Sequence, residues 1–139
     1  MFSHVSLVGI LLAALSAMVI GMIWYSLPVF GKSWRKMLGV SDEDMKKKMG
    51  PAIAVLVVVS LVTAYVLAHF IVYTHGSESG GWIEAGVKTA LWGWVGLAAT
   101  AIVAHGVFDP RNKKVLYINA GNRLVTLVVM GLIIGAFAK

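Results

Sequence analysis

Four long apolar runs constrain the fold of this chain more than any other feature of its sequence. They cover residues 5–29, 52–73, 82–107 and 115–138 of the 139 residues. Each run exceeds the ~20 residues with which a helix crosses the hydrocarbon core of a membrane. None alternates between polar and apolar residues, which argues against a transmembrane β-barrel. The sequence predicts an all-α integral membrane protein, a four-helix bundle forming a single domain over residues 1–139.

The composition supports the lipid bilayer as the surroundings of this bundle. Hydrophobic residues make up 59% of the chain and charged residues 13%, whereas about a quarter of a soluble domain is charged. The chain contains no cysteine, which excludes disulfides, thiolate metal sites and a cysteine nucleophile.

Positive charge is distributed unevenly between the predicted loops. Residues 31–50 and 108–114 hold nine of the twelve Lys and Arg residues, and residues 74–81 hold none. Loops rich in Lys and Arg stay in the cytoplasm. We therefore expect a bacterial-type inner membrane protein with these two loops cytoplasmic and both termini outside. The net charge of +6 fits contact with anionic lipid, and we expect no nucleic acid partner.

The first basic loop predicts a helix of its own. Ser41 is a typical N-cap, acids follow in the first turn, and three lysines occupy the last turn. Gly50 and Pro51 are then expected to stop the helix. The sequence thus predicts a short cytoplasmic interfacial helix between the first and second spans. Its role as a solvated connector or as a partner-binding element remains open.

Small residues recur at helical spacing in every predicted span. Such residues let membrane helices approach closely. They give each span at least one contact face, and the surplus faces favour self-association as a homodimer or higher oligomer. The residues are Gly9, Ala13, Ala17 and Gly21; Ser60, Ala64 and Ala68; Gly86, Ala90, Gly93 and Gly96; Gly131 and Gly135.

Arg123 is the most informative polar residue. It follows Lys114 by nine positions, so ~13 Å of helix rise separates the two. A charge at this depth costs at least ~2.5 kcal/mol and should face protein or water. Asn119 and Asn122 share or adjoin its face and are candidate hydrogen-bond partners in a site for a small polar or anionic solute. The alternative is an arginine that snorkels or caps helix carbonyls.

Aromatic residues gather where the first span ends, in "WYSLPVFGKSW" at residues 24–34. Tyr25 and Trp34 should lie in the same leaflet as Arg123. We take them as candidate ligand-binding residues in one wall of the same site, with membrane anchoring as the alternative. Trp92 and Trp94 lie far inside the third span, where packing against small residues or a ligand pocket would explain them.

The remaining polar residues indicate no cofactor. Glu84 precedes Lys88 by four positions, a favourable helical ion pair. His4, His69 and His75 are expected at the outer edge but lack a tight metal-ligand spacing, so we predict no metal. No catalytic motif and no paired carboxylates within a span are present, so we assign no catalytic residues.

Two kinds of function are favoured; an enzyme with a lipid-facing substrate pocket near Trp24, Tyr25 and Trp34 comes third, because no nucleophile or base is evident. Arg123 with its neighbours favours an oligomeric channel, transporter or solute-binding protein. The small-residue faces and the basic surface helix instead favour a non-catalytic scaffold or accessory subunit that binds other membrane proteins.

The motif G-x-x-W-Y-x-x-P-x-F-G-x-x-W carries a family resemblance. Gly21, Trp24, Tyr25, Pro28, Phe30, Gly31 and Trp34 provide it. It resembles the signature of a family of small bacterial membrane proteins, domain of unknown function 1761, and "YINAGNRLVTLVVMG" is similar to that family's last helix. The resemblance implies a four-helix membrane protein of about this length and implies no activity. The chain departs from the pattern at Asn122 and Arg123, where an aromatic residue is expected after the glycine.

Overall fold

The computed structural model describes residues 4–139, and every regular element in this range is helical. Four helical stretches are long and apolar enough to cross a membrane. They are α1 (Leu7–Trp24), α3 (Asp42–Ser77), the continuous stretch Trp82–Gly106, and α6 (Lys114–Phe137). The third stretch consists of α4 (Trp82–Gly93), the π-helical η3 (Trp94–Ala99) and α5 (Thr100–Gly106). The prediction of an all-α protein with four candidate membrane helices is confirmed.

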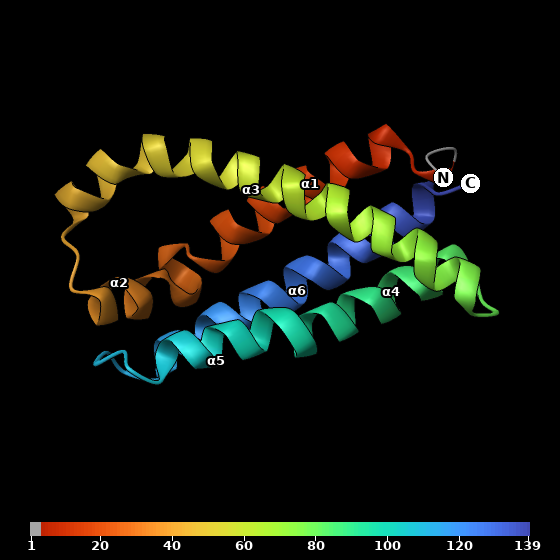
Figure 1. Ribbon diagram of the computed structural model, residues 1–139. Helices are drawn as coiled ribbons and strands as arrows, with labels where there is room; N and C mark the ends of the chain where they lie inside the picture. Colours follow the sequence, from red (N-terminus) through yellow and green to blue (C-terminus); the bar gives the residue numbers. More distant parts are fainter. Residues whose placement is uncertain (1–3) are drawn as a thin grey trace.

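The helices run lengthwise, and their connections gather at two ends (Figure 1). Both termini and the α3–α4 loop occupy one end, where His4 Nδ1 lies 2.6 Å from the Lys139 carbonyl oxygen. The other end holds α2 (Lys32–Leu38), the start of α3 and the α5–α6 loop (Figure 1). The nine cations of the two basic loops belong to these segments and to the first residue of α6, Lys114. We call the two ends the terminal end and the basic end.

The tightest packing lies toward the terminal end and depends on glycine. A Cβ added to Gly86 of α4 would collide with the Gly131 carbonyl of α6. Gly135 faces the Trp82 backbone in the same way. The predicted small-residue faces thus bring α4 and α6 into backbone contact, as is usual in membranes. The core around them includes Ala13 and Ala64, Ala68 and Ile71, Met130 and Ile134.

The prediction that the helix after Ser41 ends at Gly50 and Pro51 is wrong. Ser41 does cap a helix, accepting a 3.2 Å hydrogen bond from the Asp44 N–H. That helix is α3, which continues through Pro51 to Ser77. Proline removes one backbone donor, whereas a break here would leave several N–H groups unpaired at the edge of the hydrocarbon core. The only short α-helix between the first two spans, within the described residues, is α2.

The helix α1 ends at Trp24, with Tyr25 as its C-cap. Ser26 is extended, and the π-helical η2 (Leu27–Gly31) follows, with the Gly31 N–H donating to the Ser26 carbonyl at 2.8 Å. A Cβ on Gly31 would collide with the Tyr25 carbonyl oxygen. This tight return of the backbone therefore requires glycine at position 31, within the signature motif.

Toward the basic end α3 separates from its neighbours. All eight residues from Pro51 to Val58 of α3 are exposed, and Figure 1 shows this part of α3 leading away from α1. A Cβ on Gly21 or Gly93 would meet no atom within 4 Å, although each glycine continues the small-residue face of its helix. We call this region, at the level of Gly21 and Gly93 and beyond, the open half of the bundle.

Candidate functional site

Tyr25 joins the end of α1 to α6. Its hydroxyl donates a 2.7 Å hydrogen bond to Oδ1 of Asn119, and its ring packs on Trp34 with centroids 4.7 Å apart. The structure therefore brings together three of the residues proposed from the sequence. Both aromatic rings are half-buried, so they form a wall of the open half beside α6.

Two tryptophans hold the same segment of α6. The Trp24 Nε1–H donates to the Ile118 carbonyl at 3.0 Å, and the Trp94 Nε1–H donates to the Ala120 carbonyl at 2.9 Å. Trp24 also packs against Gly121, where an added Cβ would lie 3.0 Å from the indole. The hydrogen bond of Trp94 was not foreseen. An indole N–H far from water needs a hydrogen-bond acceptor. This requirement could have predicted from the sequence that Trp94 is hydrogen-bonded. Trp92, in contrast, is 75% exposed.

Both π-helical segments adjoin this level of α6. The segment η2 begins two residues after Tyr25, and η3 begins at Trp94 itself. Single-turn π segments within helices are frequent at functional sites. Their position supports the Asn119–Arg123 segment as the candidate site.

Arg123 lies on the inner face of α6 and is nevertheless exposed. Met130 and Ile134, seven and eleven residues further on, share its face and are 0% and 4% exposed. α3 covers the later two positions and has turned away at the level of Arg123. The expectation that Arg123 faces protein or water rather than lipid stays a prediction.

No partner neutralises Arg123 among residues 4–139. It forms neither a hydrogen bond nor an ion pair with any described residue, although it is near enough to the Tyr25 hydroxyl to act on it electrostatically. The ion pairs of the acidic side chains are formed elsewhere: Asp42 with Arg35, Glu78 and Glu84 with Lys88, and Asp109 with Arg111. The site therefore carries an uncompensated positive charge.

Two polar atoms next to Arg123 lack hydrogen bonds. Asn122 Nδ2 and Thr126 Oγ1 are buried without a partner in the described residues, and Thr126 is only 4% exposed. Asn122 was expected to orient Arg123, but no hydrogen bond joins the two. Buried polar atoms without a partner are uncommon in native proteins and call for a bound group or water.

Arg35 of α2 adds a cation that the sequence reasoning treated only as a determinant of orientation. Its Nη1 pairs with Asp42 at 3.2 Å, which links α2 to the start of α3. Its Nε is buried and has no partner in the part of the chain that the structure describes. Arg35 thus keeps one donor unused at the basic end.

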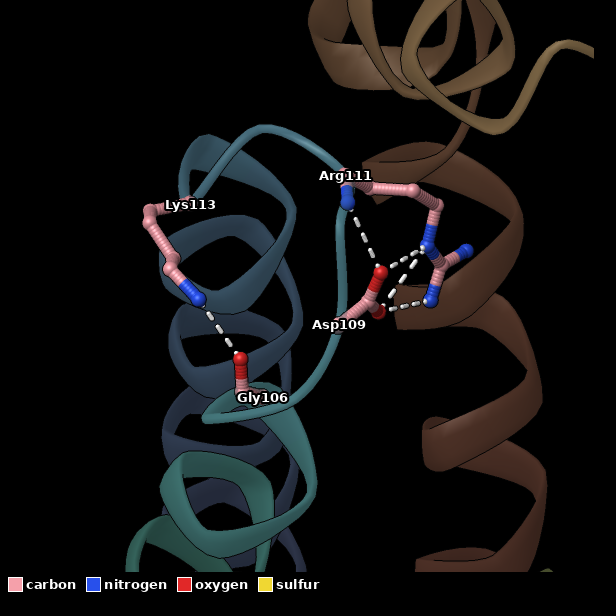
Figure 2. Close-up of polar contacts among 4 residues, drawn as sticks. All are labelled: Gly106, Asp109, Arg111 and Lys113. Carbon is pink, nitrogen blue, oxygen red and sulfur yellow. Dashed lines mark hydrogen bonds and ion pairs between the residues drawn. The ribbon is translucent and has the colours of Figure 1, made fainter.

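The α5–α6 loop fixes the start of α6 through its own charges (Figure 2). Lys113 Nζ donates to the Gly106 carbonyl at 2.6 Å, at the end of α5. The Arg111 side chain donates to both Asp109 oxygens, and its backbone N–H donates to Oδ1. These hydrogen bonds, with smaller help from Lys113, lower the pKa of the Asp109 carboxyl to about 2.

The predicted ion pair at the terminal end is present. Lys88 Nζ lies 2.9 Å from Glu84 Oε1 and also 2.9 Å from Glu78 Oε2. His75 stacks on Trp82 with centroids 3.7 Å apart. Residues 4–139 contain no group of three metal-ligating side chains. These side chains tie α3 to α4, far from Arg123.

Comparison with known families agrees with the resemblance found in the sequence. The model of a family described as a protein of unknown function, DUF1761, matches residues 8–135. The chain belongs to the DUF1761 family. In this DUF1761 protein the signature residues Trp24 and Tyr25 attach the end of α1 to α6, and the signature residues Gly31 and Trp34 pack against Tyr25. No curated protein and no solved structure matches the chain.

Proposed function

We propose that this protein binds a small anion or anionic group within the membrane at Arg123. One observation carries the proposal: Arg123 lies on the inner face of α6, exposed, without an acidic partner in the described residues. An intramembrane charge without a partner is costly and is usually retained for function. The site residues are Arg123, Tyr25, Asn119, Asn122 and Trp34.

The surrounding groups suit an anion. The Arg123 guanidinium offers several N–H donors in a planar fork, which matches a carboxylate or phosphate. Asn122 Nδ2 is an unused donor one residue away. The Tyr25 hydroxyl and Asn119 Oδ1 are hydrogen-bonded to each other. These two groups therefore shape the wall of the site and do not bind the ligand directly.

The arrangement favours binding over free permeation. Toward the terminal end, the buried residues Ala13, Ala64, Met130 and Ile134 close the centre of the bundle with apolar side chains. Access to Arg123 is therefore from the open half, on the side predicted to be cytoplasmic.

A thermal-shift titration with inorganic phosphate tests the proposal. The full chain in detergent should unfold at a higher temperature as phosphate is added at constant ionic strength, because a ligand that binds only the folded state stabilises it. Arg123→Gln should lose this stabilisation. Lys114→Gln, which removes an exposed cation from the start of the same helix, should keep it. Equal phosphate responses in the parent and both variants would contradict the proposal.

A further inference from the structure

The open half has two unlike surfaces, a cationic one and an apolar one. Arg123 provides the first. The second comes from α3, whose exposed residues Pro51–Val58 carry no polar side chain. A path for a dissolved ion would be expected to have polar groups along it. This pairing of a charge with an apolar wall instead suits an amphipathic anion.

Two residues of α3 face the opening. Ile53 and Val57 continue the helical face of Ala64 and Ile71, which are both fully buried. They are 43% and 41% exposed, against 62% for Val55 and 60% for Val58 on the outer side. Ile53 and Val57 thus form the inner wall that would be buried if α3 stayed against its neighbours.

The depth of this wall matches that of Arg123. Ser60 Oγ donates to Met18 Sδ across the α1–α3 contact, and the two helices are antiparallel (Figure 1). One turn toward the basic end from this contact lie Val57 on α3 and Gly21 on α1. The contact of Trp24 with Gly121 places Arg123 of α6 within about a turn of the same level.

We infer that the anion held at Arg123 is the headgroup of an anionic membrane lipid, which enters sideways between α1 and the N-terminal half of α3. This inference rests on the proposed function, since it names the ligand of the same site. The acyl chains lie against the exposed side chains of Ile53 and Val57. A phosphate monoester is a headgroup small enough to approach a guanidinium below the interface.

The charges at the basic end favour this lipid. The nine cations of the two basic loops lie at the same end as the opening, and juxtamembrane Lys and Arg residues attract anionic lipids. A helical side chain leans toward the N-terminus of its helix, so the guanidinium reaches from its Cα toward the basic end. The headgroup therefore needs to descend only part of the ~13 Å between Lys114 and Arg123.

Native mass spectrometry of the full chain tests the inference with three probes: phosphatidic acid, phosphatidylcholine with the same acyl chains, and inorganic phosphate. The parent protein should retain phosphatidic acid at least about tenfold better than phosphatidylcholine, as expected for a charge-assisted pair. Arg123→Gln should lose this preference. Val57→Trp should also lose it by filling the opening, whereas Val58→Trp, on the outer side, should keep it.

The outcomes separate the two proposals. Equal retention of both lipids, with phosphate binding that still requires Arg123, would overturn the lipid inference and leave the proposed function standing. Binding of neither phosphatidic acid nor phosphate through Arg123 would overturn both. Efficient disulfide dimerisation of Val57→Cys in membranes would show that a second copy covers the opening, which also overturns the lipid inference.

Discussion

The Tyr25 hydroxyl donates a 2.7 Å hydrogen bond to Asn119 Oδ1, and this bond joins segments 94 positions apart in the sequence. It fastens the end of the first membrane helix to the last, one turn before Arg123. The indole N–H groups of Trp24, at the end of α1, and of Trp94, at the start of η3, donate hydrogen bonds to carbonyls in the same turn of α6. The candidate site therefore adjoins a segment of α6 that three side chains hold by hydrogen bonds.

Replacing Tyr25 by phenylalanine should weaken this attachment. Tyr25→Phe removes the hydroxyl donor and leaves Asn119 without its partner, so the free energy of unfolding should fall by about 1 kcal/mol. Equilibrium unfolding in detergent measures the loss. Tyr117→Phe is the matched control because Tyr117 is 76% exposed on the same helix as Asn119. An equal effect of both variants would show that the hydrogen bond contributes nothing specific.

Two glycines of α4 should respond differently to alanine. Gly86→Ala places a Cβ against the Gly131 carbonyl and should destabilise the protein by about 1–3 kcal/mol, the usual cost of overpacking. Gly93→Ala meets open space and should be neutral or stabilising, since alanine favours the helix. Thermal unfolding of the two variants compares them. The reverse order would mean that α4 and α6 do not pack as described.

The signature glycine Gly31 should tolerate no side chain. Gly31→Ala forces a Cβ against the Tyr25 carbonyl and Ser26, so η2 must open and Trp34 must leave Tyr25. We expect a lower unfolding temperature and increased solvent quenching of tryptophan fluorescence. Gly50→Ala serves as the control because it adds a Cβ where no atom lies within 4 Å. Unchanged fluorescence in Gly31→Ala would refute the role assigned to η2.

Asp109 should titrate at unusually low pH. Its pKa of about 2 lies below the ordinary value of about 3.9. The stabilisation from its pairing with Arg111 is therefore complete above about pH 4 and disappears as the pH falls toward 2. Carbon NMR of the Asp109 carboxyl should show its pKa return toward the ordinary value in Arg111→Gln and shift much less in Lys113→Gln. A larger shift in Lys113→Gln would contradict the geometry of Figure 2.

The orientation predicted from loop charge is directly measurable because the chain lacks cysteine. Ser33→Cys at the basic end should react with a membrane-impermeant maleimide only after the cells are opened. Ser79→Cys at the terminal end should react in intact cells. Labelling in the opposite order would reverse the assignment of the two ends to the two sides of the membrane.

Local features of this protein were predictable from the sequence alone. Four apolar runs of sufficient length predict the four candidate spans, because every backbone group in lipid must be paired within its helix. Ser41 caps its helix and Glu84 pairs with Lys88, since both interactions join residues within two turns. Helical geometry fixes such neighbours regardless of the rest of the fold.

The relations between helices were decided only by the tertiary structure. Sequence reasoning identified Tyr25, Trp34 and Asn119 as candidates but left open whether they meet, and it gave Trp94 no acceptor. It also ended a helix at Pro51 that continues to Ser77. The exposure of Arg123 depends on where α3 leaves its neighbours, and no local pattern records that separation. Spacing along the chain determines which face of a helix a residue occupies, whereas the position of the neighbouring helices determines what that face meets.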